Sequence, residues 1–100
     1  MKIMNEKYIN YEYLSVAKNE NLVIFLGYRL TLTKTEYLIL KALTSNGGSA
    51  LSAEQISNQI GIELTKENVA FHIFNINKKA KSISERILVK NITKIGYFLN

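Results

Sequence analysis

The first third of the chain alternates polar and apolar positions with the period of β-strands. Residues 11–17 alternate loosely and predict a strand, and residues 18–21 (Lys-Asn-Glu-Asn) are typical of a polar turn. The apolar, β-branched and aromatic run at residues 22–26 predicts a second strand. After a turn at Gly27-Tyr28, residues 29–32 predict a short third strand. The chain therefore begins with a small antiparallel sheet.

The period changes to that of helices at residue 33. Residues 33–36 (Thr-Lys-Thr-Glu) have the spacing of a capping box, in which the first and last side chains bond each other's backbone amides. The dense apolar stretch at residues 37–43 then predicts a helix that buries a wide face, ended by residues 46–48 (Asn-Gly-Gly). A second capping box at residues 52–55 (Ser-Ala-Glu-Gln) predicts a short helix that ends at Gly61.

A third helix is predicted over residues 66–82, with Thr65 as its cap. One stripe of this helix is apolar and consists of Val69, Ile73, Ile76 and Ala80. At 100° per residue, the opposite face carries Phe71, Phe74, Asn75, Lys78 and Lys81. The apolar stripe is expected to face the core, and an error of helical phase would place one of the two phenylalanines there as well.

The period returns to two after Ser84. Residues 86–92 and 95–99 predict two strands around a turn at Thr93-Lys94. The order of elements is sheet, three helices and β-hairpin, which predicts an α+β fold, a winged helix-turn-helix with an N-terminal antiparallel sheet. We expect this domain to span residues 11–100, preceded by an N-terminal extension at residues 1–10.

The composition excludes most enzymatic chemistry. The chain of 100 residues has no cysteine and no aspartate, and His72 is its single histidine. A Ser-His-Asp triad and a clustered metal site therefore cannot be built, and we expect no enzyme, no cofactor and no metal. Residues 1–10 lack the pattern of a signal peptide, and no apolar run approaches the length that spans a bilayer. We expect a cytoplasmic protein with no membrane partner.

The formal net charge of +5 is concentrated at the C-terminal end. Residues 1–63 carry six basic and six acidic side chains, whereas residues 64–100 carry seven basic and two acidic ones, so the last third holds the whole excess. This asymmetry favours a polyanionic partner that contacts the third helix and the hairpin. A lysine-rich surface that only meets solvent is the alternative.

Four segments resemble the output domains of OmpR/PhoB-type response regulators. They are residues 32–40 (LTKTEYLIL), residues 51–56 (LSAEQI), the segment from Val69 to Lys79 and residues 96–99 (GYFL). The resemblance covers about residues 11–100 and implies a four-stranded N-terminal sheet, three helices and a C-terminal wing. It further implies transcriptional regulation by binding of double-stranded DNA, often as a homodimer controlled by a phosphorylated receiver domain. Without aspartate this chain cannot carry the phosphoacceptor, so an excised output domain and a free-standing one both remain open.

Three features depart from the family pattern. The family usually has arginines where this chain has Phe74, Asn75 and Asn77, and usually has an arginine in the wing where this chain has Thr93. The segment at residues 61–68 is shorter than usual, which argues against the contact with RNA polymerase that this loop makes in the family.

Nine residues of the third helix and the wing are predicted to contact DNA. The lysines are candidates for phosphate contacts, with helix-dipole stabilisation as the alternative. Asn75 is a candidate for a contact with adenine, Phe71 for a contact with a thymine methyl, and Asn68 for a contact with a base or a phosphate. His72 is a candidate for a phosphate contact, with half-buried packing as the alternative. The nine residues are Asn68, Phe71, His72, Asn75, Lys78, Lys79, Lys81, Thr93 and Lys94. The competing hypothesis is a winged-helix module for protein binding or dimerisation, with Phe71 and Phe74 as its anchors.

Overall fold

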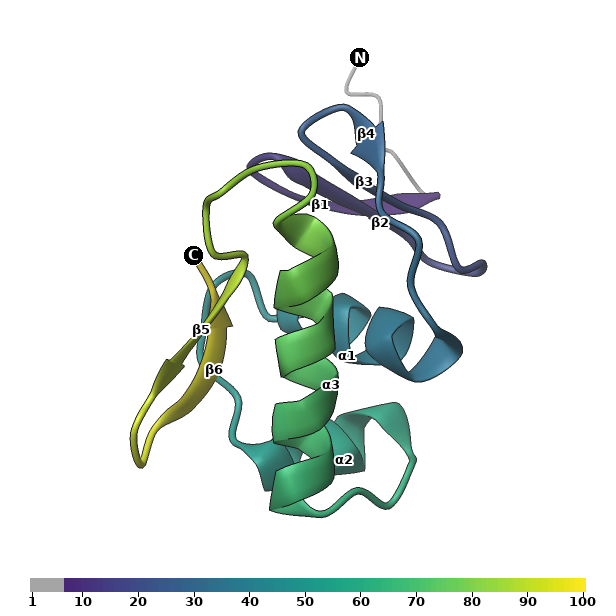
Figure 1. Ribbon diagram of the computed structural model, residues 1–100. Helices are drawn as coiled ribbons and strands as arrows, with labels where there is room; N and C mark the ends of the chain where they lie inside the picture. Colours follow the sequence, from purple (N-terminus) through teal and green to yellow (C-terminus); the bar gives the residue numbers. More distant parts are fainter. Residues whose placement is uncertain (1–6) are drawn as a thin grey trace.

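The computed structural model describes residues 7–100 and contains the predicted order of elements. A four-stranded sheet lies at one end, the helices lie beside and below it, and a hairpin runs along the last helix (Figure 1). The elements are β1 (Tyr8–Tyr11), β2 (Leu14–Ala17), β3 (Val23–Phe25), β4 (Tyr28–Arg29), α1 (Lys34–Ser45), α2 (Ala53–Ile60), α3 (Lys66–Ala80), β5 (Val89–Ile92) and β6 (Gly96–Leu99). The winged-helix fold predicted from the sequence is therefore confirmed.

The N-terminal sheet has four antiparallel strands in the order β1-β2-β3-β4. The single strand expected over residues 11–17 was wrong, because the chain turns back at Glu12, whose φ of 49° lies in the left-handed region. Tyr11 pairs with Leu14 across this tight turn, and Tyr8 pairs with Ala17. The sheet thus begins before residue 11, inside the segment expected to be an extension. Residues 1–6 of that segment lie outside the described residues.

All three helix starts are capped as the sequence predicted. The Thr33 hydroxyl accepts from the Glu36 amide at 3.2 Å, and the Glu36 carboxylate accepts from the Thr33 amide at 2.9 Å. Ser52 and Gln55 form the same reciprocal pair at α2, and Thr65 caps α3. α3 ends at Ala80 rather than residue 82, because a tighter turn follows over residues 81–83.

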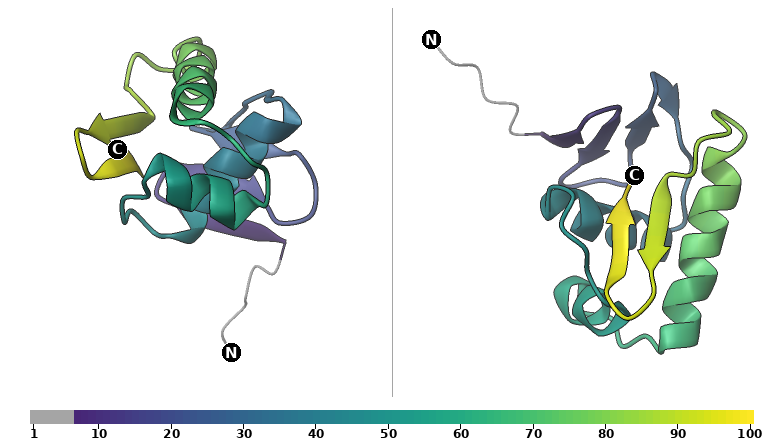
Figure 2. Two further views of the ribbon diagram at one scale, coloured as in Figure 1. Left: turned by 90° about the horizontal axis from the view of Figure 1, so that it is seen from below. Right: turned by 90° about the vertical axis from the view of Figure 1, so that its left-hand side faces the viewer.

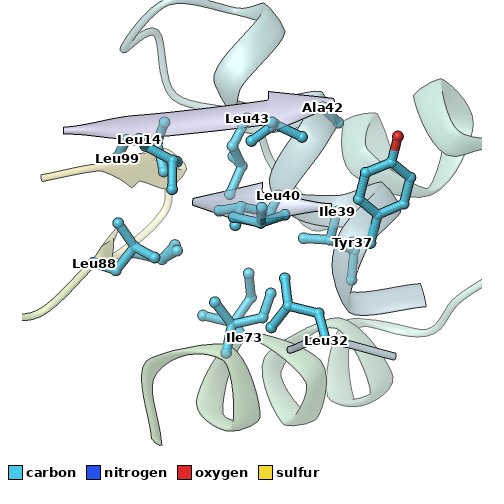
Figure 3. Close-up of a cluster of buried hydrophobic side chains, with 14 of the residues drawn as sticks. Leu14, Leu32, Tyr37, Ile39, Leu40, Ala42, Leu43, Ile73, Leu88 and Leu99 are labelled. Atoms are coloured by element: carbon cyan, nitrogen blue, oxygen red, sulfur yellow. The ribbon is translucent and has the colours of Figure 1, made fainter. Parts of the chain in front are cut away.

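The core lies where the helices meet the sheet and the end of the hairpin (Figure 3). α1 contributes the most buried side chains, including Ile39, Leu40 and Leu43, and β2 contributes Leu14 and Val16. From α3 the predicted stripe is buried, namely Val69, Ile73, Ile76 and Ala80. Each large apolar side chain that leaves water stabilises the fold by about 1.5–3 kcal/mol. The buried stripe therefore fixes which side of α3 faces outward.

The C-terminal hairpin is held against the segment between α1 and α2. Leu51 and Tyr97 exchange two backbone hydrogen bonds, at 2.8 Å and 2.7 Å, in an isolated antiparallel bridge. Gly96 has a φ of 140°, and a Cβ there would collide with the Leu51 carbonyl group. Only glycine allows this approach. The strand predicted from residue 86 begins later, at Val89, where pairing with Leu99 of β6 starts. Arg86 and Ile87 are both exposed and Leu88 and Val89 both buried, so this segment lacks the alternation of a strand.

Candidate nucleic-acid interface

The outward side of α3 is a stripe of two aromatic and two basic side chains. Phe71, Phe74, Lys78 and Lys81 follow one another at spacings of three and four residues, so they lie on one side of the helix. All four are exposed, and the two phenylalanine rings are 61% and 64% exposed. The possibility that one phenylalanine belongs to the core is therefore excluded. We call these four residues the outward stripe.

A second stripe flanks the first, and its C-terminal end lies beside β4 and α1. It consists of Asn68, His72, Asn75 and Lys79, of which only Asn68 is exposed and the other three are half-buried. The imidazole of His72 packs edge-on against the Phe71 ring, with centroids 5.8 Å apart. Within residues 7–100 the His72 Nδ1 atom is buried without a hydrogen-bond partner. The candidates for DNA contact thus divide between two sides of the helix.

Lys79 has a partner inside the domain that the sequence did not reveal. Its Nζ donates to Glu36 Oε1 at 2.6 Å, and the Glu36 side chain is 4% exposed while that of Lys79 is 38% exposed. Burial alone raises the pKa of Glu36, but the hydrogen bonds from Lys79 and Thr33 outweigh it and hold that pKa below its ordinary value. The carboxylate therefore remains charged, and Lys79 ties α3 to the first turn of α1.

Asn77 connects α3 to the wing. Its amide nitrogen donates to the Val89 carbonyl oxygen at 2.9 Å, and its Oδ1 accepts from the Val89 amide at 2.9 Å. A primary amide satisfies both backbone groups at once because it offers a donor and an acceptor side by side. The sequence showed only that an asparagine replaces the usual arginine, and the structure gives this residue a role in placing the wing.

The wing runs alongside α3, and its tip lies at the end of the molecule where α3 begins (Figure 2). Thr93 and Lys94 form this tip together with Ile95, and all three are exposed. Lys94 has a φ of 70°, the left-handed conformation that closes the turn. A groove of about 640 Å³ separates the wing from α3, lined by residues that include Lys66, Glu67, Ala70, Thr93 and Lys94. Thr93 and Lys94 are thus displayed next to the start of α3.

The described residues offer no alternative site for metal chemistry. Within residues 7–100 no three His, Cys, Asp or Glu side chains lie close enough together to hold a metal ion. In the same part of the chain no helix has the length and hydrophobicity needed to cross a membrane.

The sequence and the fold were compared with known proteins. Residues 27–99 match the model of a protein family described as "Transcriptional regulatory protein, C terminal". No match was found among curated proteins. Many solved structures match.

Three of these structures are DNA-binding domains. The domain of CpxR from E. coli is 25% identical, with a TM-score of 0.75 and coverage of 92% of this chain and 94% of that chain. The domain of Klebsiella pneumoniae RstA, solved in complex with the RstA box, is 17% identical, with a TM-score of 0.77 and coverage of 94% and 97%. The domain of response regulator AdeR, in complex with an intercistronic region, is 20% identical, with a TM-score of 0.80 and coverage of 91% and 97%.

The family model spans most of the chain, and the fold of these structures matches the sheet, helices and hairpin described above. The resemblance in the four sequence segments is thereby confirmed. The chain belongs to the OmpR/PhoB-type family of C-terminal domains of transcriptional regulatory proteins, which are winged-helix DNA-binding domains without enzymatic activity.

Proposed function

We propose that this domain regulates transcription by binding a specific sequence of double-stranded DNA, with α3 in the major groove and the β5–β6 wing on the flanking backbone or minor groove. The observation that carries the proposal is the outward stripe of α3, whose two phenylalanines and two lysines are all exposed beside an equally exposed wing tip. A major groove about 12 Å wide admits one helix and presents both base edges and flanking phosphates to it. The charge excess of residues 64–100 matches such a partner.

The predicted contacts fall into two groups. We expect Lys78 and Lys81 on α3, and Lys94 on the wing tip next to Thr93, to neutralise phosphates, which their exposure supports. We expect the Phe71 ring to meet a thymine methyl and the amide of the half-buried Asn75 to read adenine from the edge of this surface, with Asn68 on a base or a phosphate. His72 packs beside Phe71 at the edge of this surface. Lys79 is paired with Glu36 of α1, so we expect it to stabilise the position of α3 rather than to contact DNA.

The proposal is tested by titrating a fluorescently labelled pool of random duplexes at two or more salt concentrations. Each phosphate contact contributes about 0.9 to the slope of log K against log salt. We expect Lys78→Gln with Lys81→Gln to lower the slope by about 2, and Lys18→Gln, in the neutral N-terminal part, to leave it unchanged. The absence of any duplex binding at low salt would end the proposal.

A second candidate is a module for protein binding or homodimerisation through Phe71 and Phe74. It is favoured by the exposure of both rings, since exposed aromatic side chains are enriched at protein interfaces. It predicts that Phe74→Lys abolishes self-association, measured by analytical ultracentrifugation, without altering the melting curve. DNA binding that persists in this variant with an unchanged oligomeric state would eliminate the second candidate.

Binding to RNA polymerase is the least supported of the partner predictions. The loop between α2 and α3 covers only residues 61–65, which leaves a small surface for a polymerase contact. If the domain does not bind RNA polymerase, its effect on transcription would depend on where it binds DNA.

A further inference from the structure

A basic hollow lies between β4 and the second half of α3, on the side of the helix away from the wing, and it joins predicted contact residues of α3 to a residue of the N-terminal sheet. It has a volume of about 530 Å³ and is lined by Arg29, Leu30, Thr31, Asn75, Lys78, Lys79, Ser82 and Ile83. Three of these side chains are cationic and none is acidic. No pattern in the sequence indicated this site, because Arg29 belongs to the part of the chain with no net charge.

The charge of the hollow is only partly neutralised. Lys79 donates to Glu36 at 2.6 Å, so one of the three cations is already paired. Arg29 and Lys78 are both exposed, and the structure shows no hydrogen bond or ion pair to either side chain from residues 7–100. Two unpaired cations that line one hollow favour an anion between them, and the planar guanidinium group can hold two oxygens of a phosphate at once.

The position of the hollow relative to the wing indicates which anion it would hold. Asn77 touches the wing and Asn75 lines the hollow, and residues two apart lie about 200° apart around a helix. The outward stripe therefore lies between the wing on one side and the hollow on the other. A duplex that takes this stripe into its major groove has one sugar-phosphate backbone on each side of the helix.

We propose that Arg29, together with Lys78, binds a backbone phosphate on the side of α3 away from the wing, so that the domain grips the duplex from both sides of the recognition helix. This inference rests on the proposed function, because it requires α3 to enter the major groove. It adds a residue of the N-terminal sheet to an interface otherwise built from α3 and the wing. The N-terminal sheet then contacts the DNA as well as supporting the helices.

The test compares the two arginines of the chain, because Arg86 is a matched control. Arg86 is also exposed, but its guanidinium group stacks over the Tyr13 ring at 5.4 Å, away from the hollow. We expect Arg29→Gln to lower the salt slope of duplex binding by about 1 and to weaken affinity about 5- to 10-fold at low salt. Arg29→Lys should retain most of the slope, and Arg86→Gln should match the wild type. Thermal melting of each variant confirms that the fold is intact.

A titration with inorganic phosphate separates the DNA backbone from a free anion. Its binding is followed by NMR through the Arg29 side-chain Nε–H signal, and in parallel the duplex titration is repeated with Arg29→Gln. A wild type that binds duplex while Arg29→Gln keeps the full salt slope overturns this inference and leaves the proposed function standing. Saturation by free phosphate with an unchanged duplex slope overturns it in favour of a small-anion site. A wild type that binds no duplex overturns both.

Discussion

Lys78 and Lys79 are neighbours in α3, but removing their charges should affect different properties of the domain: DNA binding for Lys78 and stability for Lys79. In Lys79→Met the Glu36 carboxylate, on a side chain that is 4% exposed, loses the ammonium group at 2.6 Å and keeps the Thr33 amide at 2.9 Å. A buried carboxylate that loses its counter-ion must be desolvated without compensation or must take up a proton. Lys78→Met removes the same charge from an exposed position with no such partner.

The magnitude follows from the burial of the Lys79–Glu36 pair. Ion pairs on the surface contribute about 0–1 kcal/mol, and removal of one partner of a fully buried pair costs about 3–5 kcal/mol. Here the carboxylate is buried, but the Lys79 side chain is 38% exposed, so water screens part of the interaction. We expect Lys79→Met to lower the free energy of unfolding by about 2 kcal/mol. For a domain of this size that corresponds to a fall in Tm of about 8–16 °C.

The assay is urea and thermal unfolding followed by circular dichroism. Lys78→Met should change the free energy of unfolding by less than about 0.5 kcal/mol, because methionine is a good helix former and the site is exposed. A double-mutant cycle with Glu36→Gln should show a coupling energy of about 1 kcal/mol or more between Glu36 and Lys79. Equal stability of the two methionine variants would refute the reasoning. In duplex binding the order should reverse, with the larger loss of salt slope in Lys78→Met.

Three further predictions concern pH, the wing and base reading. The pKa of Glu36 lies below its ordinary value of 4.5, so its contribution to stability is complete above about pH 4.5 and is lost as the pH falls through the lowered pKa. Unfolding measured from pH 7 to pH 2 should show this loss in the wild type but not in Glu36→Gln. Asn77→Ala leaves the Val89 amide and carbonyl groups without their side-chain partner, so the free energy of unfolding should fall by about 1–3 kcal/mol. Hydrogen exchange of the Val89 amide should also become faster. The control variant Asn75→Ala should show neither effect. In a duplex enriched by selection, deoxyuridine in place of a contacted thymine removes one methyl group, whose burial is worth about 0.8 kcal/mol. The exchange should therefore weaken binding of the wild type about 4-fold and leave binding of Phe71→Ala unchanged. Equal losses in both proteins would exclude the methyl contact.

The sequence was sufficient for features that depend on neighbours along the chain. A capping box is complete within four residues, and both predicted boxes, at Thr33 and Ser52, are present. The buried stripe of α3 is set by helical spacing alone, which also placed Phe71 and Phe74 outside. These local patterns fixed the order of elements, and that order defined the fold.

Features that need a partner from another element were missed. The turn at Glu12 depends on pairing between β1 and β2, and the polar residues around it fit one continuous strand as well as two. Lys79 and Glu36 are 43 positions apart, so no local pattern distinguishes Lys79 from the lysine before it. The role of Asn77 could not be predicted for a similar reason. Its two partners are backbone groups of Val89, and every residue except proline carries both such groups.

The four sides of α3 differ in how strongly the fold constrains them, which explains how the fold can persist at low sequence identity while the outward residues change. One side is fixed by the core, and the sides toward α1 and the wing are fixed by Lys79 and Asn77, each with a single partner. The outward stripe is exposed, and its only ring contact given within residues 7–100 is the one between Phe71 and His72, so we expect Phe74 to take the place of the family's usual arginine at little cost to folding. The identity of 17–25% to domains of the same shape is consistent with this division. If α3 enters the major groove as proposed, with Phe74, Asn75 and Asn77 where the family usually has arginines, we expect most of the affinity for DNA to come from phosphate contacts made by Lys78, Lys81 and Arg29.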